Sequence, residues 1–216
     1  MTQPAPTRPE SSAVILRRRV VVAAVVVIGG ALLGFSLTRQ PGDTSFFWLT
    51  LALAAVWTIG AFASGPLHLG SDRRPVISGT GLGLLLGGVF IVGGLVAREI
   101  PGVREFVTRI LDFANHAPLA LVVFITVING VAEELFFRGA LYTALGNACP
   151  AVLSTVIYVI ATSATTGNPM LGVAAVVVGA VCAFERRSTG GVLAPMLTHF
   201  FWGLVMVLAL PPVFGV

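Results

Sequence analysis

Long apolar runs alternate with short polar segments along the whole chain. A helix crosses the roughly 30 Å hydrocarbon core of a bilayer with about 20 mostly apolar residues. The runs that come close to this length are residues 20–37, 46–62, 79–97, 118–145, 151–165, 170–184 and 192–210. The pattern predicts an all-α fold, a polytopic integral membrane bundle of about seven to eight transmembrane helices. An eighth helix results if the last run splits or re-enters the membrane at Pro211 and Pro212.

Residues 101–116 carry a different pattern, because apolar and charged side chains take opposite faces of one helix. The apolar face holds Val103, Phe106, Val107, Ile110 and Leu111, and the charged face holds Arg104, Glu105, Arg109 and Asp112. A helix of this kind lies in the plane of the membrane surface. We therefore expect one interfacial amphipathic helix between the third and fourth spans.

The N-terminal part divides into a tail and a helical region. Residues 1–16 are rich in polar residues and proline and lack an apolar period, so we expect a disordered cytoplasmic tail. Arg17–Arg19 precede the first apolar run, and no small-x-small cleavage site follows that run, which favours an uncleaved helix over a signal peptide. We expect residues 17–117 to form the N-terminal helices with the amphipathic segment, and residues 118–210 to form the core domain of the protein. The third span is rich in glycine, which predicts close helix packing.

Composition and charge support a membrane protein and exclude a nucleic-acid-binding one. The chain is 56% hydrophobic and 10% charged, with a mean hydropathy of +0.96, which a soluble domain fits poorly. All 13 basic residues are arginines. The predicted topology places Arg8, Arg17–Arg19, Arg73, Arg74, Arg186 and Arg187 inside and Arg39, Arg98, Arg104 and Arg109 outside. This bias predicts a multi-pass protein of the cell membrane with a cytoplasmic N-terminus.

Glu133, Glu134 and Arg138 lie inside the apolar run of residues 118–145. Each charge at the centre of a spanning helix costs roughly 2.5 to 3.5 kcal/mol, so these side chains need partners within the bundle. Glu134 and Arg138 are four residues apart and can pair on one face. Glu133 points about 100° away and shares its face with Asn129, which leaves it available for chemistry. The alternative is a structural ion pair that holds helices together.

His199 is the histidine inside a predicted span, whereas His68 and His116 lie in connecting segments. An intramembrane histidine often serves only as a hydrogen-bonding residue between helices. A histidine and a carboxylate on different helices can also activate water or bind a metal. Cys149 and Cys182 have apolar neighbours and are expected to be small buried residues with no ligand or disulfide role.

Two motifs, EELFFRG at residues 133–139 and GVLAPMLTHFFWG at residues 191–203, resemble those of the CPBP family of CAAX prenyl endopeptidases and bacteriocin-processing (Abi) membrane proteases. The resemblance covers residues 118–210. It implies an all-helical intramembrane protease in which the first glutamate of EExxxR and a histidine of FxxxH activate water, and the histidine and asparagine of HxxxN stabilise the oxyanion. It therefore implies that Glu133, Glu134, Arg138 and His199 are catalytic residues.

Two positions depart from the family motifs. Tyr158 and Thr162 of YVIAT stand where FxxxH has its aromatic residue and its histidine, and Gly203 stands where HxxxN has its asparagine. Threonine is no general base at neutral pH, and glycine has no side-chain donor. Glu133 and His199 are the tentative metal ligands, fewer than the three that zinc usually takes, so we expect weak or absent zinc binding and slow proteolysis.

Three functions remain open from the sequence. The first is an intramembrane metallo- or glutamate-type endopeptidase that acts on a membrane protein or a lipidated peptide in the bilayer. The second is an inactive relative that binds a membrane protein as an immunity or assembly factor. The third is a small proton-coupled transporter, although the chain shows no internal repeat.

Overall fold

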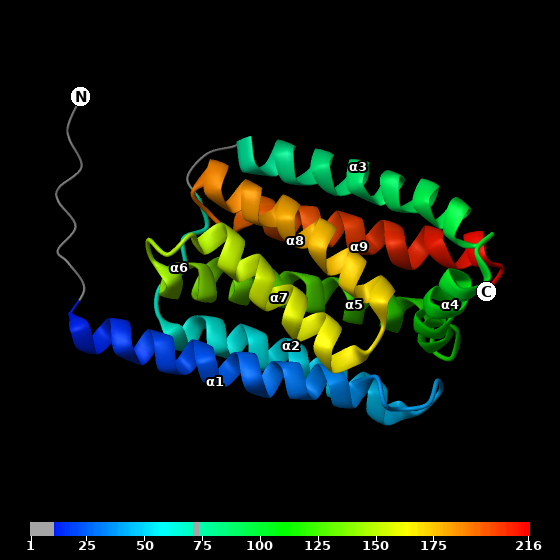
Figure 1. Cartoon of the computed structure of the whole chain (residues 1–216), viewed down its shortest axis with the longest axis horizontal. Helices are drawn as coiled ribbons and strands as arrows, with labels where there is room; N and C mark the ends of the chain where they lie inside the picture. The colour runs from blue at the N-terminus through cyan, green and yellow to red at the C-terminus, as the bar shows by residue number, and fades with distance from the viewer. Residues whose placement is uncertain (1–10, 71–73) are drawn as a thin grey trace.

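The computed structural model describes residues 11–70 and 74–216, and every regular element in these residues is helical. The elements are α1 (Ser12–Ser36), α2 (Thr44–Ser64), α3 (Arg74–Ala97), α4 (Pro101–Asn115), α5 (Leu119–Glu134), the π-helix η1 (Leu135–Leu141), α6 (Tyr142–Leu145), α7 (Pro150–Thr166), α8 (Pro169–Thr189) and α9 (Leu193–Phe214). Figure 1 shows them as one elongated bundle, with α1 and α2 along one side and α3 along the opposite side. The predicted all-α fold is confirmed.

Six apolar helices of the described residues are long enough to cross a bilayer, and α5, η1 and α6 together form one of them. The remaining predicted span, residues 151–165, corresponds to α7 (Pro150–Thr166), which is shorter, with 17 residues. The last predicted span does not split, because α9 continues through Pro211 and Pro212 to Phe214. Both prolines lie in the last turn of α9, so the intrahelical hydrogen bonds that they remove are close to the end of the helix. The chain is thus a multi-pass membrane protein, and the eight-helix alternative is not formed.

Two predicted boundaries are wrong in detail. Helix α1 begins at Ser12, so residues 12–16 are helical, while residues 1–10 of the predicted tail and Arg73 lie outside the described residues. The predicted span of residues 170–184 ends too early, because α8 continues through the charged residues Glu185 and Arg186 to Thr189. These two side chains are buried and bond to other helices, which explains why the helix extends past them. Gly190, with φ of 69°, follows the helix in the left-handed conformation that favours glycine.

The predicted glycine packing is confirmed where α3 lies along α9. A Cβ added at Gly79 would lie 2.5 Å from the Ala194 carbonyl oxygen, and one at Gly83 would lie 2.7 Å from the Thr198 carbonyl oxygen. Thr198 Oγ1 also lies 3.1 Å from the carbonyl oxygen of Gly79. The small residues let the two backbones approach closely, and this contact fixes the position of α9.

The N-terminal helices pack on the predicted core. Helix α2 contacts both α1 and α5–η1. Trp57 of α2 is buried between Phe136 and Phe137 of η1, with ring centroids 4.8 and 5.0 Å apart. The N-terminal helices thus support the segment that carries Glu133.

Asp43 caps the start of α2. It accepts a hydrogen bond from the backbone N–H of Ser45 at 2.8 Å, and this bond lowers the pKa of Asp43.

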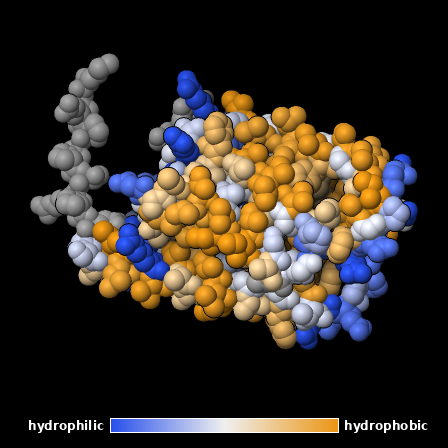
Figure 2. All heavy atoms as spheres, in the orientation of Figure 1, coloured by the Kyte–Doolittle hydropathy of each residue, from blue (hydrophilic) through white to orange (hydrophobic). Residues whose placement is uncertain are grey.

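Hydrophobic side chains cover the middle of the bundle, and hydrophilic ones gather toward its two ends (Figure 2). Arg19 donates to the carbonyl of Ala144 at one end, and Arg98 donates to the carbonyl of Val213 at the other. Arg19, predicted to lie inside, and Arg98, predicted to lie outside, therefore bond at opposite ends of the bundle. The predicted amphipathic helix forms α4, next to the end of α9.

The cytoplasmic position of the N-terminus remains a prediction, which labelling can test. Ser188 is exposed in the last turn of α8. In a chain with both native cysteines replaced by serine, Ser188→Cys should resist a membrane-impermeant thiol reagent added to intact cells. Gln40→Cys, exposed between α1 and α2, is the positive control and should react. Efficient labelling of Ser188→Cys would reverse the topology.

Candidate functional site

The charged cluster lies where the α-helical geometry of α5 ends. Helix α5 ends at Glu134, and Leu135–Leu141 form a π-helix whose residues are all buried. Such wider turns are rare and occur frequently at functional sites. Glu133 and Glu134 therefore occupy the last α-helical positions, and Arg138 lies inside the wider turn.

Two buried side chains, Arg138 and His199, contact the carboxylate of Glu134. Its Oε1 accepts from Arg138 Nη1 at 3.2 Å and lies 2.9 Å from Nδ1 of His199. The side chains of Glu134 and Arg138 have no exposed surface. The predicted pairing of Glu134 with Arg138 is confirmed. His199 also joins Glu134, a contact that the sequence did not predict.

Glu133 faces a different set of groups. Its Oε2 accepts a hydrogen bond from the Tyr158 hydroxyl of α7 at 2.8 Å and lies 4.0 Å from Nε2 of His199. Its side chain is 16% exposed, whereas that of Glu134 is completely buried. The two neighbouring carboxylates thus differ: one is buried and held, and the other is partly open and faces a histidine.

The buried arginine is fixed from three sides. Arg138 Nη2 donates to the carbonyl of Gly179 in α8 at 3.0 Å, and its guanidinium lies 4.7 Å from the centre of the Tyr158 ring. Its own carbonyl accepts a hydrogen bond from Arg186 Nε at 2.9 Å. Because these bonds connect η1, α7 and α8, the carboxylates have a defined position in the bundle.

A second polar contact supports the histidine. Glu185 of α8 accepts a hydrogen bond from the hydroxyl of Thr198, the residue before His199. A Cβ added at Gly130 would lie 2.9 Å from the His199 ring, so α5 and α9 approach closely at this level. The ring of His199 also lies edge-to-face with Trp202, with centroids 5.4 Å apart. These contacts fix the imidazole between the two glutamates.

The structure brings together all four residues singled out in the sequence and adds Tyr158. The sequence already indicated the Tyr158 hydroxyl, because tyrosine stands where the family motif has phenylalanine. Thr162 is half-buried one turn further along α7, and among the described residues its hydroxyl bonds to neither Glu133 nor His199. Gly203 packs against Thr126, with 3.3 Å between a Cβ added there and the threonine methyl. Neither position replaces the polar group that the family motif has.

The donor set does not fit a tightly bound zinc ion. Glu133 and His199 offer two donor atoms, while the neighbouring carboxylate of Glu134 is bound to Arg138 and to the other imidazole nitrogen. Residues 11–70 and 74–216 contain no group of three or more His, Cys, Asp or Glu side chains that could hold a metal. His116 bonds to the carbonyl of Asp112 near the end of α4. Cys182 is buried as predicted, but Cys149 is exposed, because it lies in the turn before α7.

Comparison with known proteins agrees with the two motifs. Residues 115–205 match the family described as type II CAAX prenyl endopeptidase Rce1-like. The match includes Glu133, Glu134, Arg138, Tyr158 and His199. No significant match was found among the curated proteins or among the solved structures. The resemblance inferred from the motifs is confirmed.

Proposed function

We propose that this multi-pass protein, which is of the CAAX-protease type over residues 115–205, hydrolyses a peptide bond in or at the membrane. The observation that carries the proposal is the contrast between the two glutamates. Glu134 is buried and bound to Arg138 and His199, whereas Glu133 is partly exposed and lies 4.0 Å from His199 Nε2. A purely structural ion pair would not need the second, open carboxylate.

A water molecule is the proposed bridge between Glu133 and His199. A separation of 4.0 Å between Glu133 Oε2 and His199 Nε2 is too long for a direct hydrogen bond. One oxygen atom can lie within about 2.8 Å of both atoms. The Tyr158 hydroxyl bonds to the same Oε2 and holds the carboxylate in this orientation. Glu133 is therefore the proposed general base, and water is the nucleophile.

His199 is the proposed oxyanion stabiliser. In this role both imidazole nitrogens act as hydrogen-bond donors. Nδ1–H then donates to Glu134. Nε2–H is directed to the Glu133 side, where the substrate carbonyl oxygen would develop negative charge. Glu134 and Arg138 act as positioning residues, because they hold the imidazole without reaching the reacting atoms.

The proposed reaction needs no further reactant than water. Glu133 takes one proton from water while the water oxygen bonds to the carbonyl carbon, and His199 donates a hydrogen bond to the resulting oxyanion. The C–N bond then breaks as Glu133 returns the proton to the leaving amine. No step uses a metal, because the donor set does not fit one. The proposed substrate is a membrane protein or a lipidated peptide that reaches this depth from the bilayer.

Purified wild type should cleave prenylated or transmembrane peptides slowly, and Glu133→Gln should abolish the cleavage. The substitution keeps the size of the side chain but removes the base. Glu105→Gln, an exposed carboxylate on α4, is the matched control and should retain wild-type cleavage. Product analysis by mass spectrometry gives the rate, and metal analysis of the same samples tests the expectation of weak zinc binding.

Thr162→His distinguishes the proposal from its main alternative. An inactive wild type that gains cleavage with this variant would contradict the proposal and indicate an inactive relative that binds membrane proteins. Activity that survives in Glu133→Gln would contradict the role of the carboxylate. Inactivity of all variants together with proton-coupled flux in liposomes would indicate a transporter instead.

A further inference from the structure

We infer that the end of the bundle at α4 binds a glycerophospholipid, with its phosphodiester at Arg104 and an acyl chain in an apolar cavity between the helices. This site is separate from the cluster around Glu133, which does not line it. The inference therefore does not depend on the proposed proteolysis.

The apolar part is a cavity of about 540 Å³ bounded by α2, α3, α4, α5, α8 and α9. This volume lies within the range of roughly 300 to 1,000 Å³ that is typical of small-ligand sites. No charged side chain lines it, and Thr126 and Trp202 are the lining residues with a side-chain O–H or N–H group. Because the protein spans a membrane, hydrocarbon rather than water is the available occupant.

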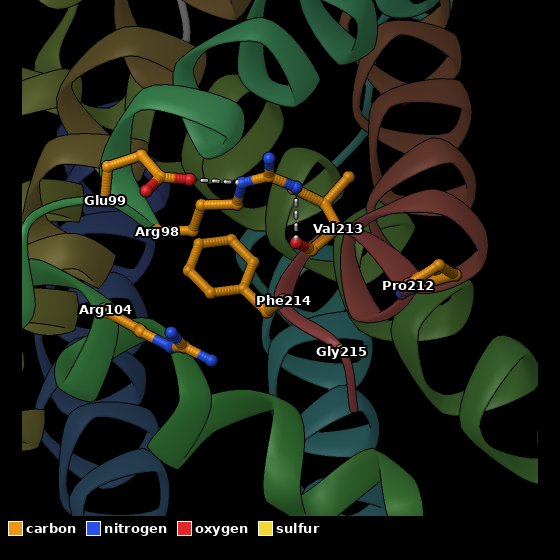
Figure 3. A pocket seen from close by; sticks show the side chains of 7 residues that line it. All are labelled: Arg98, Glu99, Arg104, Pro212, Val213, Phe214 and Gly215. Atoms are coloured by element: carbon orange, nitrogen blue, oxygen red, sulfur yellow. Dashed lines mark hydrogen bonds and ion pairs between the residues drawn. The ribbon is translucent and has the colours of Figure 1, made fainter.

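The polar part is a neighbouring pocket of about 350 Å³ lined by Arg98, Glu99, Arg104 and residues 212–215. Phe214 lines both the pocket and the cavity, so the two lie side by side. In the view of Figure 3, the ring of Phe214 lies between the side chains of Arg98 and Arg104. A polar pocket beside an apolar cavity suits an amphiphile, with its polar head in the first and its tail in the second.

The charges of the pocket favour a phosphate group. Arg98 donates to Glu99 at 2.8 Å and to the carbonyl of Val213 at 3.4 Å. The Arg104 guanidinium makes no hydrogen bond within residues 11–70 and 74–216 and remains available. Two arginines and one glutamate leave the lining side chains with a net positive charge. A guanidinium binds phosphate oxygens through parallel hydrogen bonds.

The position of α4 places the junction at the level of lipid headgroups. Val107, Ile110 and Leu111 of its apolar face line the cavity, while Arg104 lines the pocket. An amphipathic helix of this kind lies at the boundary between headgroups and acyl chains. A phospholipid can therefore contact both compartments without leaving its leaflet.

Native mass spectrometry of the full chain in detergent can test the site with three lipids that share dioleoyl chains. The protein should retain phosphatidylglycerol and phosphatidylethanolamine in preference to dioleoylglycerol, which lacks the phosphodiester. Arg104→Gln should weaken retention of both phospholipids by about tenfold. Arg109→Gln, on the same helix but outside the pocket and the cavity, should retain them as wild type does.

A second variant tests the cavity. Gly93 lines it, and a Cβ added there meets no atom within 4 Å, so Gly93→Leu should fill the space without strain. This variant should lose phospholipid, whereas Gly88→Leu, equally unobstructed but outside the cavity, should not. Equal retention of dioleoylglycerol and phospholipids would overturn the inference. Unchanged retention in Gly93→Leu would overturn it too, because the lipid would then be bound elsewhere on the surface.

Discussion

Replacing Arg138 by leucine should lower the free energy of unfolding by about 3 to 5 kcal/mol, the cost of leaving a buried charge without its partner. Glu134 would lose its cation while keeping its contact with His199, and the Gly179 carbonyl would lose the Arg138 donor. The expected results are a lower yield of folded protein and a melting temperature in detergent lower by on the order of 10 °C. Thermal unfolding followed by fluorescence or size-exclusion chromatography measures both.

Arg98→Leu is the matched control, because it breaks an exposed ion pair with the same substitution. The side chains of Arg98 and Glu99 are 43% and 71% exposed, and such pairs contribute about 0 to 1 kcal/mol. The double variant Glu134→Leu with Arg138→Leu removes both buried charges and should cost less than the sum of the single variants. Wild-type stability of Arg138→Leu would show that the buried pair is not needed for folding.

Gly83→Ala should destabilise the bundle by about 1 to 3 kcal/mol, the usual cost of an added group in a packed core. Its Cβ would lie 2.7 Å from the carbonyl oxygen of Thr198 and 3.1 Å from the Thr198 Cα. These are backbone atoms, so α3 and α9 must separate. Thermal unfolding in detergent should show a lower melting temperature than that of the wild type.

Gly88→Ala provides the comparison on the same helix. A Cβ at Gly88 meets no atom within 4 Å, and alanine is favoured over glycine in a helix by up to about 1 kcal/mol. Its stability should therefore equal or slightly exceed that of the wild type. Equal effects of the two alanines would mean that the Gly83 contact does not hold α3 against α9.

The spans could be predicted because helix length and hydropathy follow directly from bilayer thickness. The pairing of Glu134 with Arg138 could be predicted because residues four apart share a helix face. The end of α8 could not be predicted. Charged residues such as Glu185 and Arg186 are typical of a loop, and only their partners on α9 and η1 explain why they are helical and buried. Their burial depends on tertiary contacts for which the local sequence has no signal.

The site was predicted as a set of residues but not as a geometry. Glu134 and His199 are 65 residues apart, and no spacing rule brings an imidazole nitrogen to one carboxylate rather than its neighbour. The π-helix after Glu134 has no recognisable signature in LFFRGAL. The Tyr158 hydroxyl is different, because a polar group at the aromatic position of the motif was present in the sequence and could have indicated the bond to Glu133.

The glycine contact between α3 and α9 restricts where a substrate of the proposed peptidase could enter. Two neighbouring extended chains lie about 4.7 Å apart, far more than the space beside Gly79 and Gly83, where even an added Cβ would lie 2.5 and 2.7 Å from carbonyl oxygens of α9. A polypeptide cannot pass from the lipid through this seam. A substrate of the proposed peptidase must therefore reach Glu133 and His199 by another route, because the seam at Gly79 and Gly83 is closed.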